Sequence, residues 1–304
     1  MVNVVGILGA GKMGVAMARN FAAAGVRVVA FDPLPAARER VAAEGMEVVE
    51  SLKALGSHPD VDAVLSIVPN DAALRGAVEG ADGLASTMRE GTVHVCAATV
   101  SPHTAREMAK IHDASGKSTY VGSPIFARPD GVAQKQGSFC LGGAASAVEK
   151  VEPLLRLTAK DCFNFGDDPG AGNVVKLCGN FMIASAIESI SEALALAESN
   201  GADREAVMEM LSSTIFDCLI YKGYGERVSK RLHLPRETNF GLELGLKDVD
   251  LVMDTARKSD TSMPFASILQ SRYLAAYNRG MGDLDWSALG LTASEDSGTK
   301  AEPK

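Results

Sequence analysis

Hydrophobic residues in the first half of the chain gather in short runs, and stretches with helical periodicity separate these runs. The runs are rich in β-branched residues and are bounded by Gly, Asp or Pro, as is typical of strands. The stretches between them include residues 13–24 and 102–115, which read as helices. This alternation predicts an α/β fold with a parallel, doubly wound sheet. We expect strands at residues 4–8, 26–31, 61–68, 92–96, 118–121 and 138–141.

The pattern changes near residues 166–170, after which strand-like runs disappear. Residues 172–200 contain no proline, and Ile183, Ile187 and Ile190 belong to an apolar stripe at helical spacing. A helix this long is expected to cross from one domain to the other. Shorter helices are expected at residues 204–212, 242–258 and 262–279. The resulting division is a sheet domain over residues 1–168, an all-helical domain over 169–292 and a disordered tail over 293–304.

Composition narrows the class of protein. A chain of 304 residues with a net charge of −8 has room for two cores and lacks the basic character of nucleic-acid or membrane-surface binders. The five cysteines show no C-x-x-C spacing and the five histidines no metal-ligand spacing, which indicates reduced thiols and no metal site. Glycines interrupt the apolar N-terminus and no uninterrupted apolar run reaches about 20 residues, so we expect no targeting segment and no membrane span. These features favour a cytoplasmic protein.

A glycine-rich turn follows the first predicted strand. Its sequence fits G-x-G-x-x-G and opens a helix, which is the context of a dinucleotide-binding motif in a Rossmann domain. The first glycine permits a tight turn, the second lets the backbone approach a pyrophosphate, and the third packs the helix on the strand. The residues of this predicted cofactor site are Gly9, Gly11, Lys12, Met13 and Gly14.

Asp32 ends the second predicted strand, where a carboxylate would accept hydrogen bonds from the adenosine ribose and repel a 2′-phosphate. No arginine adjoins it, so the sequence favours NAD over NADP. Arg38 leaves NADP possible. The alternative for Asp32 is a turn residue placed before Pro33.

Three further residues lie at or just beyond the carboxyl ends of predicted strands, where open parallel sheets bind ligands. They are Val68, Pro69 and Thr99. We assign them to the cofactor site, although each could be an ordinary loop residue.

Lys176 and Asn180 stand four residues apart near the start of the long helix, which places an ammonium and a carboxamide on one helix face. Hydride transfer to a carbonyl builds negative charge on its oxygen, and an ammonium within hydrogen-bond reach can stabilise and protonate that oxygen. The alternative is a pair of solvated helix residues. The apolar neighbours Val175 and Leu177 favour the catalytic interpretation.

In these features the chain resembles the β-hydroxyacid dehydrogenase family, which includes 3-hydroxyisobutyrate dehydrogenases and semialdehyde reductases and has imine reductases as relatives. The resemblance covers residues 3–290. Four motifs carry it, in order: Gly6–Asn20, Thr99–Pro102, Gly170–Asn180 and Lys247–Asp248. It implies that Lys176 is the general acid and base, that Asn180 holds the substrate oxygen or orients the lysine, and that Thr99 and Lys247 contact the cofactor.

The loop that grips the substrate departs from the family's D-A-P-V-S-G-G pattern. Phe126 replaces its serine, and Ala127 and Arg128 replace its two glycines. A large apolar ring in place of a hydroxyl suggests a less polar substrate, for example a semialdehyde. Arg128 is either a substitute anion contact or a solvated loop arginine. Phe240 is assigned to the substrate site, with a core aromatic as its alternative.

The expected function is therefore NAD-dependent hydride transfer to or from a small carbonyl or hydroxy compound, in a homodimer or homotetramer. An imine reductase is the second hypothesis, and Lys176 argues against it because those relatives generally carry aspartate or tyrosine there. A non-catalytic dinucleotide-binding protein is the third.

Overall fold

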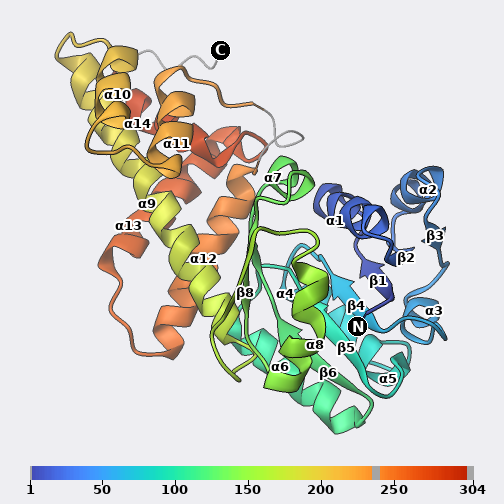
Figure 1. The fold of residues 1–304 in the computed structure, drawn as a ribbon. Helices are drawn as coiled ribbons and strands as arrows, with labels where there is room; N and C mark the ends of the chain where they lie inside the picture. Colours follow the sequence, from blue (N-terminus) through green and yellow to red (C-terminus); the bar gives the residue numbers. More distant parts are fainter. Residues whose placement is uncertain (1, 235–239, 300–304) are drawn as a thin grey trace. The chain divides into compact units, whose positions relative to one another are not determined.

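The computed structural model describes residues 2–234 and 240–299. The chain forms two compact units that divide after Lys176, and each is considered separately (Figure 1). This division lies inside helix α9 (Ala171–Ser199), whereas the sequence placed it between residues 168 and 169. The first turns of the long helix thus belong to the first unit.

A six-stranded sheet with the order β3-β2-β1-β4-β5-β6 forms the centre of the first unit, and its neighbouring strands run parallel. The order reverses between β1 and β4, as in a doubly wound sheet. The strands are β1 (Val4–Leu8), β2 (Arg27–Phe31), β3 (Glu47–Val48), β4 (Ala63–Ser66), β5 (Thr92–Cys96) and β6 (Ser118–Gly122).

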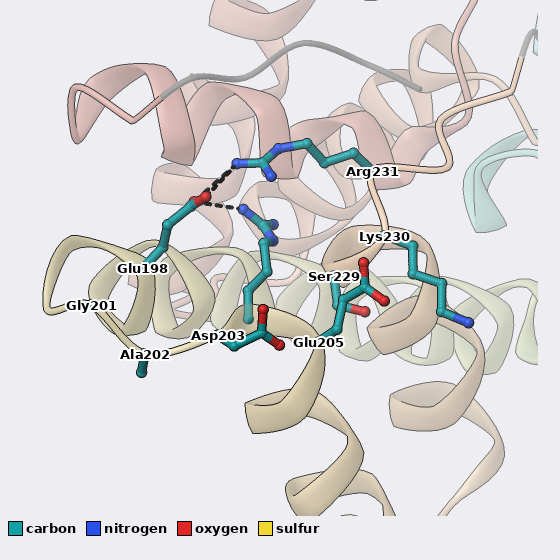
Figure 2. A pocket seen from close by; sticks show the side chains of 9 residues that line it. Glu198, Gly201, Ala202, Asp203, Glu205, Ser229, Lys230 and Arg231 are labelled. Atoms are coloured by element: carbon teal, nitrogen blue, oxygen red, sulfur yellow. Dashed lines mark hydrogen bonds and ion pairs between the residues drawn. The ribbon is translucent and has the colours of Figure 1, made fainter.

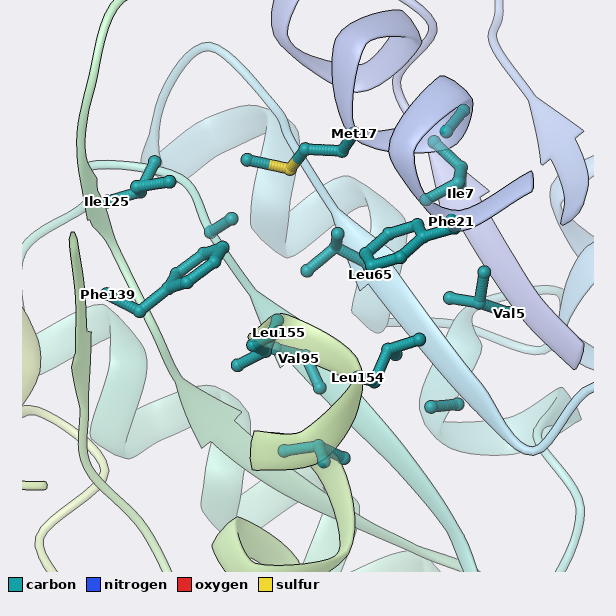
Figure 3. Close-up of a cluster of buried hydrophobic side chains, with 14 of the residues drawn as sticks. Val5, Ile7, Met17, Phe21, Leu65, Val95, Ile125, Phe139, Leu154 and Leu155 are labelled. Atoms are coloured by element: carbon teal, nitrogen blue, oxygen red, sulfur yellow. The ribbon is translucent and has the colours of Figure 1, made fainter. Parts of the chain in front are cut away.

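Helices cover both faces of this sheet. On one face, Met17 and Phe21 of α1 pack with Leu154 and Leu155 of α8 over a layer of strand residues that includes Leu65 (Figure 3). The other face is covered mainly by α3, α4, α5 and α6. The helices of this unit are α1 (Lys12–Ala23), α2 (Pro35–Ala43), α3 (Leu52–Gly56), α4 (Asp71–Val78), α5 (Leu84–Thr87), α6 (Pro102–Ser115), α7 (Pro129–Ala133) and α8 (Ala145–Leu155).

Four buried polar side chains form a continuous series of hydrogen bonds on the face of the sheet that α6 covers. Hydrogen bonds join Ser66 Oγ to His94 Nε2 (2.8 Å), His94 Nδ1 to His112 Nε2 (2.9 Å) and His112 Nδ1 to Ser118 Oγ (2.7 Å). Both histidines are fully buried. Burial and the adjacent His112 lower the pKa of His94 well below its usual value, and burial lowers the pKa of His112 to about 4. Both rings are therefore neutral at pH 7.

A second, small sheet has the order β7-β8-β9, formed by β7 (Ile125–Phe126), β8 (Ser138–Leu141) and β9 (Asp161–Asn164). The strand expected at 138–141 is present, but it belongs to this sheet and runs antiparallel to β7. The prediction that it extends the parallel sheet is wrong. The reason is that β7 comes between β6 and β8 in the chain and takes β8 as its antiparallel partner, while the other edge of β8 pairs with β9.

The described residues of the second unit form helices that pack around α9. Ile187, Ile190 and Leu194 of α9, part of the predicted stripe, form a core with side chains from the later helices. Those helices are α10 (Arg204–Ser213), α11 (Leu219–Ser229), α12 (Leu242–Lys258), α13 (Pro264–Ala276) and α14 (Leu289–Asp296), with a π-helical turn at Tyr277–Met281 and a short 3-10 helix at Trp286–Ala288.

The predicted disordered tail begins too early. Residues up to Asp296 continue helix α14, and Thr292, Ala293 and Ser294 are buried. Small residues in a polar stretch resemble a linker in composition, but here their size lets the helix pack closely. Residues 300–304 of the predicted tail lie outside the described residues.

Helix α9 is apolar as well as long. By length and composition alone it could cross a membrane, since an 18-residue window has a mean hydropathy of 1.3, but core helices of soluble proteins pass the same test. Half of that window is buried within the protein. The buried half contributes to the core of the second unit.

Candidate functional site

The glycine motif forms a tight turn between β1 and α1. Gly9 has φ +100°, and a Cβ there would lie 2.3 Å from the carbonyl oxygen of Ile67. A Cβ on Gly14 would lie 1.9 Å from the carbonyl oxygen of Gly9. Around Gly11, in contrast, a Cβ would meet no protein atom within 4 Å. Two glycines therefore serve packing, and Gly11 leaves open space at the N-terminus of α1, where a pyrophosphate fits.

Lys12 and Met13 are the first residues of α1, which begins without a side-chain cap. Lys12 is exposed, whereas Met13 is partly buried against the sheet core. Because the dipole of a helix favours negative charge at its N-terminus, this turn is suited to phosphate groups.

Asp32 is buried and holds the glycine turn in place. Its Oδ2 accepts a hydrogen bond from the Ala10 amide (2.8 Å), and its Oδ1 accepts one from the Leu34 amide (2.8 Å). Asp32 therefore has the turn role that was its alternative interpretation. Since each carboxylate oxygen has two acceptor sites, the Asp32 carboxylate can still accept a hydrogen bond from a ribose hydroxyl.

Arg38 is held close by. Its guanidinium donates to the carbonyl oxygen of Asp32 (2.7 Å), pairs with Glu50 (3.4 Å) and lies 5.9 Å from the centre of the Phe31 ring. The guanidinium that would accommodate an NADP phosphate thus reaches from α2 to the end of β2, with part of its hydrogen-bonding capacity already used.

Three other predicted cofactor residues lie at the same edge of the sheet, and the fourth, Lys247, lies on α12 of the second unit. Val68 and Pro69 follow β4, and Thr99 follows β5. Strands β1, β4 and β5 are neighbours, so their carboxyl ends bring these loops close to the glycine turn. Val68 is partly buried, Pro69 is exposed and Thr99 is half-buried. This edge, next to the reversal of strand order, is where open parallel sheets bind ligands.

The first turn of α9 is fixed on the sheets of the first unit. A Cβ on Gly172 would lie 2.1 Å from the carbonyl oxygen of Cys140 in β8, and one on Gly122 would lie 2.2 Å from the carbonyl oxygen of Pro169. The Asn173 carboxamide donates to the carbonyl oxygen of Val100, in the loop after β5 (3.2 Å). Glycines and one buried amide thereby set the position of the next turn, which carries Lys176.

Lys176 is buried rather than solvated, with 9% of its surface exposed. Its Nζ lies 4.0 Å from the centre of the Phe126 ring, within the range of a cation–π interaction. Sequence reasoning assigned both residues to the site but did not foresee that they touch. Ala127 packs on the sheet core beside them, and Arg128 precedes α7 as its N-cap residue.

Asn180 lies one turn further along α9, in the second unit, and is also buried. Its Nδ2 donates to Asp248 Oδ2 at 2.5 Å, and Asp248 Oδ1 forms an ion pair with Lys247 Nζ at 2.9 Å. Because a carboxylate only accepts, the amide nitrogen must face Asp248, which leaves Asn180 Oδ1 as an acceptor. Asp248 was named only as part of a motif, and its buried position on α12 reveals a partner for Asn180.

Phe240 packs in the core of the second unit. Its ring meets that of Trp286 edge-to-face, with 4.8 Å between their centres. Trp286 also contacts Tyr224, at 5.6 Å. The alternative interpretation of Phe240 as a core aromatic is therefore supported, and it remains half-buried rather than enclosed.

A pocket of about 430 Å³ lies elsewhere in the second unit (Figure 2). Three basic side chains (Arg204, Lys230, Arg231) and three acidic ones (Glu198, Asp203, Glu205) line it together with small residues. Glu198 bonds both arginines, at 2.8 and 2.9 Å. The three positive and three negative side chains balance in charge, and none of the predicted site residues lines the pocket. We therefore interpret it as a structural contact between helices that its ion pairs hold together.

Comparisons with known proteins agree with this arrangement. Residues 4–166 match the family model of the NAD-binding domain of 6-phosphogluconate dehydrogenase. Residues 170–290 match a second family model, which is described as the NAD-binding region of NADP-dependent 3-hydroxyisobutyrate dehydrogenase. Both matches meet at the start of α9.

Individual relatives span nearly the whole chain. An NAD-dependent L-serine dehydrogenase of Pseudomonas aeruginosa is 28% identical, covering 94% of this chain and 96% of its own. The solved 3-hydroxyisobutyrate dehydrogenase of Mycobacterium tuberculosis is 26% identical, covers 96% of this chain and 99% of its own, and has a TM-score of 0.85. An imine reductase from a Pseudomonas species is 19% identical over 96% of this chain and 99% of its own, with a TM-score of 0.61, and shares the fold alone.

Proposed function

Because the chain belongs to the β-hydroxyacid dehydrogenase family and is an NAD(P)-dependent oxidoreductase, we propose that it interconverts a small carbonyl compound and its alcohol. Lys176 is the general acid and base in this proposal. The observation that carries it is the buried Lys176 ammonium, fixed against Phe126 in the same unit as the glycine motif.

When bound, the nicotinamide supplies the hydride for reduction or accepts it in oxidation. The chain's own contribution is proton transfer. In reduction, Lys176 Nζ donates a proton to the carbonyl oxygen as negative charge develops there, and in oxidation the neutral amine takes the proton back. General acid catalysis of this kind contributes roughly 10²–10⁴-fold in rate.

Asn180 supports the same oxygen in this proposal. Asp248 holds its carboxamide nitrogen, so Asn180 Oδ1 is presented as an acceptor. An acceptor fixed in this way can orient a substrate hydroxyl or the Lys176 ammonium one helical turn away. Lys247 neutralises the Asp248 carboxylate and is proposed to contact the cofactor.

The substrate is proposed to be of the semialdehyde or β-hydroxyacid type. Phe126 stands where a polar holder was expected from the resemblance, and its ring presents an apolar face beside the lysine. This favours a substrate with an uncharged carbon next to its carbonyl group. Arg128, two residues on, is the proposed contact for a carboxylate at the far end of a semialdehyde acid.

We further propose that the protein is cytoplasmic, that it prefers NAD to NADP, and that it forms a homodimer or homotetramer. The apolar side chains of Met182 and Leu196 on α9 and Ile268 on α13 are each more than half exposed, as expected for a face that pairs with another subunit. Light scattering after size-exclusion chromatography measures the oligomeric state, and a monomeric mass would contradict the proposed homodimer or homotetramer.

A carbonyl panel, followed at the NADH absorbance band with NADPH alongside, tests the function. We expect reduction of at least one semialdehyde or ketoacid, loss of most of kcat in Lys176→Ala, and retained NADH binding. Lys110→Ala, at an exposed position on α6, serves as the matched control. Near wild-type turnover in Lys176→Ala would exclude the assigned role.

The same panel separates the alternatives. Faster conversion of a cyclic imine to a secondary amine than of any carbonyl would identify an imine reductase. Cofactor binding without reduction of any compound would indicate a non-catalytic protein.

A further inference from the structure

Phe126 offers the Lys176 ammonium a ring face instead of a hydrogen-bonding group. The distance of 4.0 Å from Nζ to the ring centre is short for such a pair, and the lysine is buried. Desolvation strengthens the attraction between an ammonium and a ring quadrupole. Lys176 also takes part in another interaction, so the ring is not the only group that defines its position.

The ring is held by regular structure rather than by a loose loop. Phe126 ends β7 and pairs in register with Ser138 of β8. Side chains alternate along a strand, and the preceding Ile125 is buried in the sheet core, so Phe126 must point to the opposite face. Gly137 packs against Ile125 and Ala127 and keeps this strand close to its partner.

The lysine is fixed from the other side. Gly172 and Asn173 join the first turn of α9 to β8 and to the loop after β5. Ring and ammonium are therefore both positioned by elements of the first unit.

A ring face has a chemical advantage over a hydroxyl at this place. A hydroxyl would occupy one of the three N–H donors of the ammonium, whereas the ring attracts the charge without accepting a conventional hydrogen bond. The ring therefore holds the ammonium without using one of its N–H donors.

We propose that Phe126 is a positioning residue, whose ring holds the Lys176 ammonium in the orientation from which it donates its proton. This inference rests on the proposed role of Lys176. It requires an aromatic ring at position 126, whereas a packing role would require only an apolar side chain of similar volume.

Substitutions that separate aromaticity from bulk test this proposal. With the best substrate of the carbonyl panel, Phe126→Leu should lower kcat about 10-fold, which is the loss of a desolvated cation–π contact expressed as a rate. The KM for NADH should change little, and Phe126→Trp and Phe126→Tyr should keep kcat within about 3-fold of wild type. A Leu variant with wild-type kcat would overturn the proposal.

Fluorinated phenylalanines at position 126 avoid the possibility that a variant misfolds, because they preserve ring shape while weakening the negative face. We expect kcat to fall stepwise as fluorine atoms are added. An unchanged kcat across the series would refute the positioning role. If Lys176→Ala is inactive while the series is flat, only this inference fails; if Lys176→Ala is active, the proposed function itself fails.

Discussion

Asp248 Oδ2 accepts a hydrogen bond of 2.5 Å from the carboxamide nitrogen of Asn180, a residue 68 positions earlier in the chain. Both side chains are buried, and the other carboxylate oxygen pairs with Lys247. One buried carboxylate thus determines which way the Asn180 amide faces and also anchors a predicted cofactor residue. This makes Asp248 a positioning residue of the candidate site.

Replacing Asp248 with Asn should therefore impair turnover. The variant loses the negative charge and one of the two acceptor oxygens that serve Asn180 and Lys247, so one of these contacts is lost and the other is weakened. A hydrogen bond to a charged group contributes about 1.5–3 kcal/mol, so kcat should fall roughly 10–100-fold. Steady-state kinetics measure the effect, and thermal unfolding reports any loss of stability. Asp250→Asn is the control, because Asp250 lies on the same helix but is exposed. A kcat within about 2-fold of wild type in Asp248→Asn would show that the Asn180 amide needs no such holder.

Cofactor preference should depend on Asp32. A 2′-phosphate charge about 4 Å from a carboxylate near the protein surface is repelled by roughly 4 kcal/mol, so the wild-type protein should favour NADH. Asp32→Asn removes this charge, and the ratio of kcat/KM for NADH to that for NADPH should fall by more than about 10-fold. Asp32→Asn should also lose stability, because Asn has one acceptor oxygen for the two amides of Ala10 and Leu34. Asp60→Asn, at an exposed position, controls for net charge. A wild-type preference for NADPH would contradict this assignment.

Acid should destabilise the first unit through His94 and His112. Both pKa values are lowered in the folded protein, that of His112 to about 4. Between the unfolded value near 6.5 and the folded one, the unfolded chain binds more protons, so stability is lost as the pH falls through this window. For His112 the loss is on the order of 3 kcal/mol.

Urea unfolding at pH 7.5 and pH 5 measures this loss. The difference in unfolding free energy between pH 7.5 and pH 5 should be smaller in His112→Gln than in the wild type. It should be unchanged in His103→Gln, because His103 is exposed on the same helix. Glu188, whose pKa burial raises to about 7, changes stability in the opposite direction, so the comparison between variants is decisive. Equal pH dependence in His112→Gln and wild type would mean that the buried pair does not govern acid stability.

Much of this architecture could be predicted because the hydrophobic pattern is strong where elements are long or fully buried. The strand at 92–96 and the helices at 102–115 and 242–258 were predicted with the observed bounds. The two-residue strands β3 and β7 were missed, since periodicity needs more residues to be visible. Strand β9 escaped because two of its four residues are exposed and polar residues begin and end it.

Which side chains contact one another in the fold was harder to predict than which residues belong to the site. Lys176, Asn180 and Phe126 could each be assigned to the site from motifs. That Phe126 covers the ammonium, and that Asp248 turns the amide of Asn180, depend on strand register and helix packing that one sequence does not encode locally. The buried chain through His94 and His112 was missed for the same reason, because alternation along a strand does not indicate which helix covers it.

The glycine contacts at the first turn of α9 have a practical consequence for protein engineering. Gly122 and Gly172 leave no room for a methyl group where that turn meets the strands. Anyone who grafts the helical half of a relative onto this nucleotide-binding half should join the two after Lys176. A junction placed at the apparent linker near residue 168 would exchange this fitted turn for one shaped to another partner.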